Sequence, residues 1–164
     1  MDMTQPTWTY QGRIFNDISD FPKDTYGFIY QVLHKPSGLK YLGKKVLFFE
    51  RNKRLGKRAL EALKEERKAK GIGGRTPLKQ KVITESDWKD YYGSHPKIKK
   101  LVKESKDLRA DFERKILDIV PKKKLLTYYE CKHLFINDVL ETYSHQYIND
   151  NILGKFYRKD FEND

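Results

Sequence analysis

The clearest structural signal in this chain is a β-hairpin in residues 26–47. Residues 26–34 (YGFIYQVLH) are rich in aromatic and β-branched side chains, which strands favour. The next four residues, Lys35-Pro36-Ser37-Gly38, form a turn signal, because proline suits the second turn position and glycine tolerates positive φ. We therefore predict that residues 39–47 (LKYLGKKVL) return as a second strand, antiparallel to the first.

The rest of the chain predicts helices and one more strand. Residues 50–70 hold good helix formers and predict a helix of about four turns, ended by the glycines after it and a flexible loop at 71–77. Ser86 is a candidate cap for a short helical turn. The remaining predictions are a helix opened by His95-Pro96, a strand at 112–120 and a helix at 125–140.

This order of elements predicts the α+β class, with a small, mainly antiparallel three-stranded sheet flanked by helices. A basic helical insertion is expected at about residues 51–81. The 164 residues suit one domain with such an insertion. Residues 1–25 carry scattered aromatics and predict an arm packed onto the domain at 26–155, and residues 156–164 form a tail.

The net charge of +11 is concentrated in the middle of the chain. Residues 46–124 hold 24 Lys/Arg against 12 Asp/Glu, whereas residues 125–164 hold four against seven. Such a basic segment attracts polyanions, with phosphate backbones first and anionic lipid second. A Lys-rich solvated surface is the alternative, so charge alone leaves nucleic-acid binding open.

A set of residues suited to chemistry lies in order along these elements. Tyr30 lies on the first predicted strand and Tyr41 on the second, so pairing the strands would bring the two phenols to one end of the sheet. The set continues with Lys44, Arg51, Glu130 on the late helix, and Asn149 and Asn151 near the C-terminus.

This ordered set resembles the GIY-YIG nuclease family. The matching motifs are Phe28-Ile29-Tyr30 and Tyr41-Leu42-Gly43, and the spacings of the tyrosines and of Arg51 agree with the family. Phe28 stands where the family has its first glycine, and Leu42 replaces the usual Ile or Val. The later segments WKDYYGS, FERKIL, YYEC and YINDN resemble phage-encoded members, so the resemblance covers about residues 26–155.

The resemblance implies a DNA endonuclease that hydrolyses phosphodiester bonds with a divalent metal. Tyr30 or Tyr41 would be the general base, and nearby cations would favour its phenolate. Glu130 would bind the metal, with Mg²⁺ expected and Mn²⁺ as the alternative, because one carboxylate suits an ion that keeps several waters. Arg51 would hold the scissile phosphate through its bidentate fork, beside Lys44. Either Asn149 or Asn151 matches the family's late asparagine.

The basic insertion is the expected DNA grip, acting mostly through phosphate contacts. Residues 51–81 hold 12 Lys/Arg against three Asp/Glu. The residues expected to contact DNA are Lys53, Arg54, Lys57, Arg58, Lys64, Arg67, Lys68, Lys70 and Arg75.

Each of these residues also has a structural interpretation. The tyrosines could be ordinary cross-strand aromatics, and Lys44 and Arg51 surface charges. Thr127 and Glu130 have the spacing of a helix capping box. His95 is a secondary candidate that could donate to a phosphate, although a histidine before proline suits a helix start. The rival functions are a non-catalytic basic nucleic-acid-binding protein and a degenerate family member that serves as an interaction module.

Several protein classes are excluded or disfavoured by composition. The single cysteine, Cys131, rules out a disulfide within the chain. No apolar run approaches the ~20 residues of a membrane span, and the polar N-terminus does not resemble a signal peptide, so we expect a cytoplasmic protein without a membrane partner. One active site per chain means that two cuts need a homodimer or two encounters. Homing, degradation of host DNA and exclusion of rivals all remain open as biological roles.

Overall fold

The predicted hairpin is the centre of the structure. The computed structural model describes residues 4–141 and 143–162, and in it β3 (Gly27–His34) pairs antiparallel with β4 (Leu39–Val46) along their full lengths. Gly38 closes the turn at φ +71°, a conformation that residues with a Cβ rarely adopt. The prediction of two strands joined at Lys35–Gly38 is confirmed.

The α+β class is also confirmed, but the main sheet has five strands and not three. Its order is β2-β1-β7-β3-β4, and the predicted third strand is β7 (Phe112–Val120), antiparallel to β3. The two extra strands, β1 (Trp8–Tyr10) and β2 (Arg13–Phe15), come from the predicted arm. Gln11 and Gly12 join them, both at positive φ as the tight turns of hairpins require. The arm is therefore part of the sheet, and β1 pairs parallel to β7.

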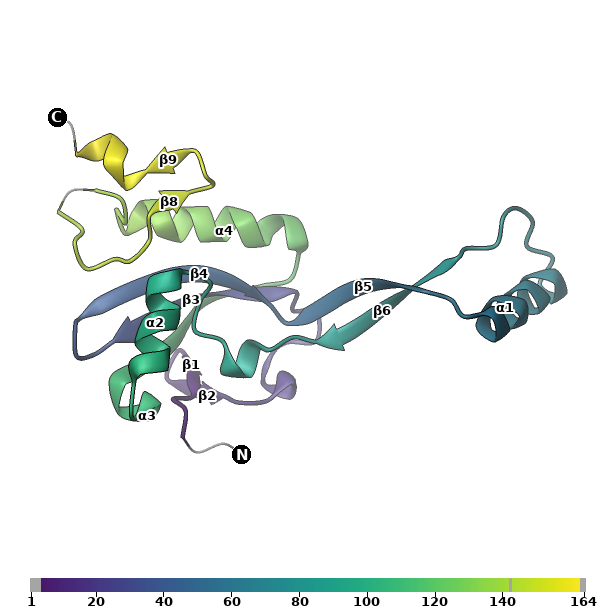
Figure 1. Cartoon of the computed structure of the whole chain (residues 1–164), viewed down its shortest axis with the longest axis horizontal. Coiled ribbons are helices and arrows are strands. Elements are labelled where there is room, and N and C mark those ends of the chain that lie inside the picture. The colour runs from purple at the N-terminus through teal and green to yellow at the C-terminus, as the bar shows by residue number, and fades with distance from the viewer. Residues whose placement is uncertain (1–3, 142, 163–164) are drawn as a thin grey trace. The chain divides into compact units, whose positions relative to one another are not determined.

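Both faces of the sheet are covered, which explains the apolar run in β3. Phe28, Tyr30 and Val32 lie on one face, in a core that includes Trp88 and Ile98. The residue between the first two, Ile29, faces the other side and packs against Leu126 of α4. Because successive residues of a strand point to opposite faces, a strand buried on both faces reads as continuous hydrophobic sequence. Figure 1 shows α4 running over one face of the sheet.

The helices outside residues 48–86 lie close to their predicted positions. In α2 (Pro96–Glu104), the His95 ring caps the first turn by accepting a hydrogen bond from the Lys97 backbone N–H, and Pro96 occupies the first turn. The predicted late helix is α4 (Lys123–Ile136), which begins two residues and ends four residues earlier than expected. Ser86 is not a cap, since Asp87 precedes the 3₁₀ turn η2 (Trp88–Asp90). The remaining short helices are η1 (Ile18–Asp20), α3 (Leu108–Asp111) and η3 (Arg158–Phe161).

The C-terminal residues form a small hairpin. Strand β8 (Asn151–Ile152) pairs antiparallel with β9 (Phe156–Tyr157), so the start of the predicted tail is part of a hairpin. The guanidinium of Arg158 donates to the backbone carbonyls of Val139, Tyr147 and Asn149. This segment is therefore hydrogen-bonded to the unit that carries the main sheet.

Residues 48–86 form a second compact unit, separate from the unit made by the rest of the chain. It consists of the antiparallel ribbon β5 (Phe48–Arg54) and β6 (Lys79–Glu85) and the helix α1 (Lys57–Ala69). The helix predicted for residues 50–70 is therefore wrong over Glu50–Arg54, which are strand. The basic insertion is not helical throughout, because pairing with β6 gives the backbone of this polar stretch its hydrogen bonds.

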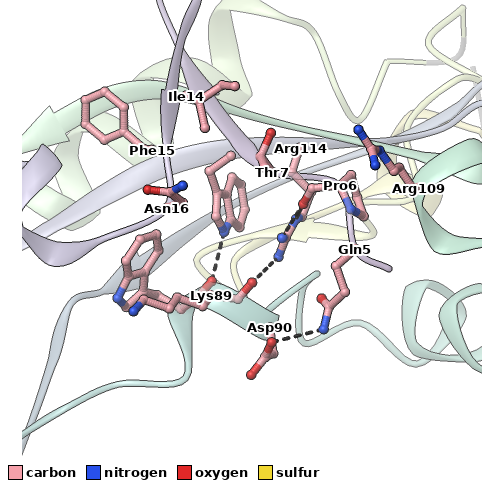
Figure 2. Close-up of a pocket in the computed structure, with 12 residues that line it drawn as sticks. Gln5, Pro6, Thr7, Ile14, Phe15, Asn16, Lys89, Asp90, Arg109 and Arg114 are labelled. Atoms are coloured by element: carbon pink, nitrogen blue, oxygen red, sulfur yellow. Dashed lines mark hydrogen bonds between the residues drawn. The ribbon is translucent and has the colours of Figure 1, made fainter. Parts of the chain in front are cut away.

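A buried arginine joins the start of the chain to the main sheet. Arg114 of β7 lies between the rings of Trp8 and Tyr92, 4.7 Å from each centroid, and donates to the carbonyls of Pro6, Lys89 and Tyr91. Burial lowers the pKa of its guanidinium to about 10. Figure 2 shows the bonds from Arg114 to Pro6 and Lys89 beside a cavity of about 350 Å³, which none of the predicted catalytic residues lines.

Candidate active site

Tyr30 and Tyr41 lie side by side on one face of the β3–β4 pair. In the strand register Tyr30 is opposite Gly43 and Tyr41 is opposite Val32, so the two tyrosines are diagonal neighbours. Their ring centroids are 6.3 Å apart. The expectation that strand pairing brings the two phenols together is confirmed. Glycine at position 43 leaves the room that the Tyr30 ring fills.

Tyr30 is a core residue. Its side chain is only 1% exposed and lies against Trp8 and Tyr91, with ring centroids 5.5 and 5.8 Å away. Burial, followed by the neighbouring Tyr91 and Tyr41, raises the pKa of Tyr30 well above its ordinary value of 10.0. Its phenol therefore stays protonated at neutral pH.

Tyr41 is more accessible. It is half-buried, and its hydroxyl lies 3.4 Å from the Ser94 Oγ. Its ring packs tightly on Gly93, where an added Cβ would lie 2.8 Å from two ring carbons. Burial raises the pKa of Tyr41 and outweighs the opposing hydrogen bond to Ser94. Burial is the largest cause of the raised pKa at both tyrosines.

Glu130 and Lys44 form an ion pair between α4 and β4. The Lys44 Nζ lies 2.9 Å from the Glu130 Oε2 and donates to the Thr127 Oγ1 at 3.0 Å. Both side chains are partly exposed, at 38% for Lys44 and 22% for Glu130. The capping-box interpretation of Thr127 and Glu130 is excluded, because both lie inside α4 and the helix N-cap is Lys122.

These groups converge on a cavity at the β4 edge of the sheet. Its volume is about 300 Å³, and Tyr41 lines it together with Lys44 and Glu130. Within residues 4–141 and 143–162, no group of three or more His, Cys, Asp or Glu side chains could hold a metal ion. The two carboxylates that line the cavity, Glu130 and Asp150, fit Mg²⁺, which is commonly bound through one or two carboxylates and several waters.

Asn149 holds the strand that carries Tyr41. Its side chain is 6% exposed, its Oδ1 accepts from the Leu42 N–H at 3.0 Å, and its Nδ2 donates to the Leu42 carbonyl at 2.8 Å. The exposed Asn151 instead closes a turn by accepting from the Gly154 N–H. Both residues line the cavity, and only Asn149 has its amide bound to β4 among the described contacts.

Asp150 is a cavity residue that the sequence did not suggest. Its Oδ2 lies 2.5 Å from the His95 Nε2, and the His95 ring lies 6.0 Å from the Tyr41 ring, between centroids. Because the Lys97 N–H occupies the His95 Nδ1, the Nε2 carries the hydrogen shared with Asp150. In the sequence, Asp150 lies in the YINDN segment, between the two candidate asparagines.

The remaining predicted site residues belong to the second unit. Arg51 is exposed on β5, opposite Val82. It is not among the residues that line the cavity. Lys53 and Arg54 are also exposed on β5. Arg67 is half-buried and donates to the Gly73 carbonyl, and Lys70 pairs with Glu66 at 2.6 Å. The other predicted contacts with DNA are exposed on α1 and its following loop: Lys57, Arg58, Lys64, Lys68 and Arg75.

Comparison with known proteins gives one family. The family model described as "Putative endonuclease segE, GIY-YIG domain" matches residues 8–152, which include the main sheet, most residues that line the cavity, and the second unit. No curated protein and no solved structure matches the chain. Among the described residues, no helix combines the length and the apolar character needed to cross a membrane.

Proposed function

The chain belongs to the GIY-YIG endonuclease family, and from that premise we propose that it hydrolyses DNA phosphodiester bonds in the cavity at the β4 edge, with a divalent metal. The family is one of nucleases, so the chain is an endonuclease. Metal dependence, DNA as the substrate, and the role of each residue are the parts proposed here.

One observation carries the proposal. A phenol, an ammonium group and a carboxylate, from Tyr41, Lys44 and Glu130, line the same cavity of about 300 Å³. Hydrolysis of a phosphodiester needs a proton acceptor for the attacking water and positive charge near the phosphate oxygens. These three residue types meet those needs in one place.

Tyr41 is the favoured general base of the two tyrosines. It borders the cavity, whereas Tyr30 is 1% exposed and lies in the core. A base must reach the proton it accepts, either directly or through one water. Tyr41 would accept the water proton at its phenolate oxygen, and Tyr30 would hold the Tyr41 ring in place from the side.

Lys44 and Arg51 are the proposed partners of the phosphate. The Lys44 Nζ is already fixed by Glu130 and Thr127, so its charge stays at the cavity wall without further ordering. Arg51, exposed on β5, supplies a planar guanidinium that matches two phosphate oxygens. Its assignment rests on its spacing from Tyr41.

Glu130 is the proposed protein ligand of the metal. Its carboxylate borders the cavity, and Mg²⁺ is commonly bound through one or two carboxylates with waters and substrate phosphate oxygens. When bound, such an ion would polarise the phosphate and stabilise the leaving oxygen. The Lys44 ammonium group, 2.9 Å from the Glu130 Oε2, would keep that carboxylate oriented.

The test is the nicking of supercoiled plasmid by the wild type, by Glu130→Gln and by a matched control, Glu113→Gln. Glu113 is an exposed carboxylate on β7 that does not line the cavity. Each protein is incubated with Mg²⁺, with Mn²⁺ and with EDTA. We expect metal-dependent nicking by the wild type and the control, and a loss of at least about 100-fold in Glu130→Gln.

Other outcomes would redirect the proposal. Equal nicking in EDTA would remove the metal from it, and full activity in Glu130→Gln would remove Glu130. DNA binding by all three proteins with no cutting under any condition would favour the non-catalytic nucleic-acid-binding protein.

A further inference from the structure

The ribbon formed by β5 and β6 has two chemically different faces. Because strand side chains alternate and paired residues share a face, the register sorts its residues into two sets. One set, here called the Arg51 face, consists of Phe49, Arg51, Lys53, Gln80, Val82 and Thr84. The opposite set, called the Glu50 face, mixes both charges and consists of Phe48, Glu50, Asn52, Arg54, Lys79, Lys81, Ile83 and Glu85.

Carboxylates lie on the Glu50 face alone. Glu50 pairs with the Nζ of Lys81 at 3.0 Å on that face, where Glu85 also lies. The Arg51 face carries two cations and no acid, and its polar side chains Arg51, Lys53, Gln80 and Thr84 are all exposed. A polyanion would therefore meet attraction without repulsion on the Arg51 face.

The side chains of the Arg51 face contribute little to a buried core. Of the residues of β5 and β6, none is buried, and Phe49 and Val82 of the Arg51 face are half-buried. Arg51 lies over the Phe49 ring, 5.8 Å from its centroid, so that its stem packs on this face. Lys53 and Gln80, an exposed cation and an exposed amide, are directly opposite each other across the two strands.

We propose that the Arg51 face of the β5–β6 ribbon lies in the major groove of duplex DNA and reads base edges there. The major groove admits a two-stranded ribbon, and its base edges are read by these side chains: Arg or Lys on guanine O6 and N7, and Gln on adenine N6 and N7. This inference rests on the proposed function, and it adds sequence choice to a grip otherwise made of phosphate contacts.

The helix and the ribbon of the second unit would then have different roles in DNA binding. The exposed cations of α1, among them Lys57, Arg58, Lys64 and Lys68, would contact phosphates and give affinity without sequence choice. Lys53 and Gln80 would discriminate between bases. Arg51 lies on the same face as Lys53 and Gln80. The side chain expected at a DNA phosphate and the two side chains expected at bases therefore point to the same side of the ribbon.

The chain offers a closely matched control. Lys53 pairs with Gln80 on the Arg51 face, and on the adjacent rung Asn52 pairs with Lys81 on the Glu50 face. Each pair consists of one lysine and one amide, and all four side chains are exposed. The double variants Lys53→Ala/Gln80→Ala and Asn52→Ala/Lys81→Ala thus lose the same charge and the same group types.

The experiment selects bound duplexes from a randomised DNA library with the full chain in EDTA, followed by sequencing. We expect the wild type and Asn52→Ala/Lys81→Ala to enrich the same bases, and Lys53→Ala/Gln80→Ala to lose preference by about 5- to 100-fold at one or two positions. Replacing purines of the selected site with 7-deazapurines, which lack the N7 acceptor, should weaken wild-type binding and leave Lys53→Ala/Gln80→Ala nearly unaffected.

The proposal is overturned if the wild type enriches no bases, if both double variants change preference equally, or if 7-deazapurines have no effect on the wild type. Circular dichroism and thermal melting confirm that both variants are folded. Failure here leaves the plasmid-nicking result untouched, and failure to nick leaves this selection informative, so the two proposals are tested separately.

Discussion

Gly43 lies directly opposite Tyr30 across the β3–β4 pair, so close that a Cβ at position 43 would be 2.5 Å from the Tyr30 hydroxyl oxygen. The third residue of the Tyr-Leu-Gly motif is therefore needed for packing. It leaves room for the Tyr30 ring beside β4, the strand that carries Tyr41. Tyr41 depends on this arrangement because its ring packs beside Tyr30.

Gly43→Ala should destabilise the protein by about 1–3 kcal/mol, because the added methyl group overlaps a ring that the core holds in place. Urea unfolding followed by circular dichroism measures this change. Gly73→Ala is the control, since nothing lies within 4 Å of a Cβ at Gly73. Equal stabilities of the two variants would show that the Tyr30 ring moves aside at little cost.

Asn149→Ala should lower the free energy of unfolding by about 2–4 kcal/mol, because it leaves the Leu42 N–H and carbonyl without their partner. Asn151→Ala, which removes an exposed turn contact, should cost much less. Denaturant unfolding compares the two. A stable Asn149→Ala protein without nuclease activity would instead indicate that Asn149 contacts the substrate.

Tyr41→Phe should lower the nicking rate by about 10²–10⁴-fold, the usual contribution of a general base. The wild-type rate should rise from pH 6 to pH 9 because the phenolate is the active form and burial raises the pKa of Tyr41 above 10.0. Tyr128→Phe, at an exposed tyrosine of α4, is the control. A flat pH profile in the wild type would point to a different base.

Tyr30 should make stability fall at alkaline pH. Its pKa is raised in the folded protein, so the unfolded chain loses this proton first, from about pH 10 upward. The stabilisation is complete below pH 10 and is lost as the pH rises toward the folded pKa. Thermal melting from pH 8 to pH 11 should therefore show a decline that is shallower in Tyr30→Phe. Parallel declines would mean that other groups cause it.

Neutralising four exposed cations of α1 should flatten the salt dependence of DNA binding. The variant changes Lys57, Arg58, Lys64 and Lys68 to Gln, and the slope of log K against log salt should fall by about three to four if each contacts a phosphate. Fluorescence anisotropy with a duplex measures the slope. A charge-matched control changes Lys99, Lys103, Lys106 and Arg109 to Gln. Equal slopes in the two variants would argue against a special role for α1.

The sequence predicted the parts of the fold that have a strong local signal. The β3–β4 hairpin has a proline-glycine turn between two apolar runs, and β7 was predicted with its observed bounds. At the site, Tyr41, Lys44, Glu130 and Asn149 were all named before they were found around one cavity. These site residues came from the resemblance of the ordered motifs to the GIY-YIG family, which local propensity does not provide.

The elements that were missed depend on distant partners. Residues 50–54 are polar helix formers with no apolar alternation, and they become strand because β6 pairs with them from 25 or more positions away. Strands β1 and β2 are three residues each, too short for a clear pattern, and the Gln-Gly turn between them was the overlooked signal. Asp150 was missed because its partner, His95, is 55 positions away.

The second unit has few buried side chains, and this affects which of its residues can be replaced during evolution. Its strands and helix hold no buried residue, so substitutions there remove nothing from a hydrophobic core. Its two ends are neighbours, since Phe48 pairs with Glu85. On the role proposed for Lys53 and Gln80, target preference can therefore change by single substitutions in the ribbon at little cost in stability.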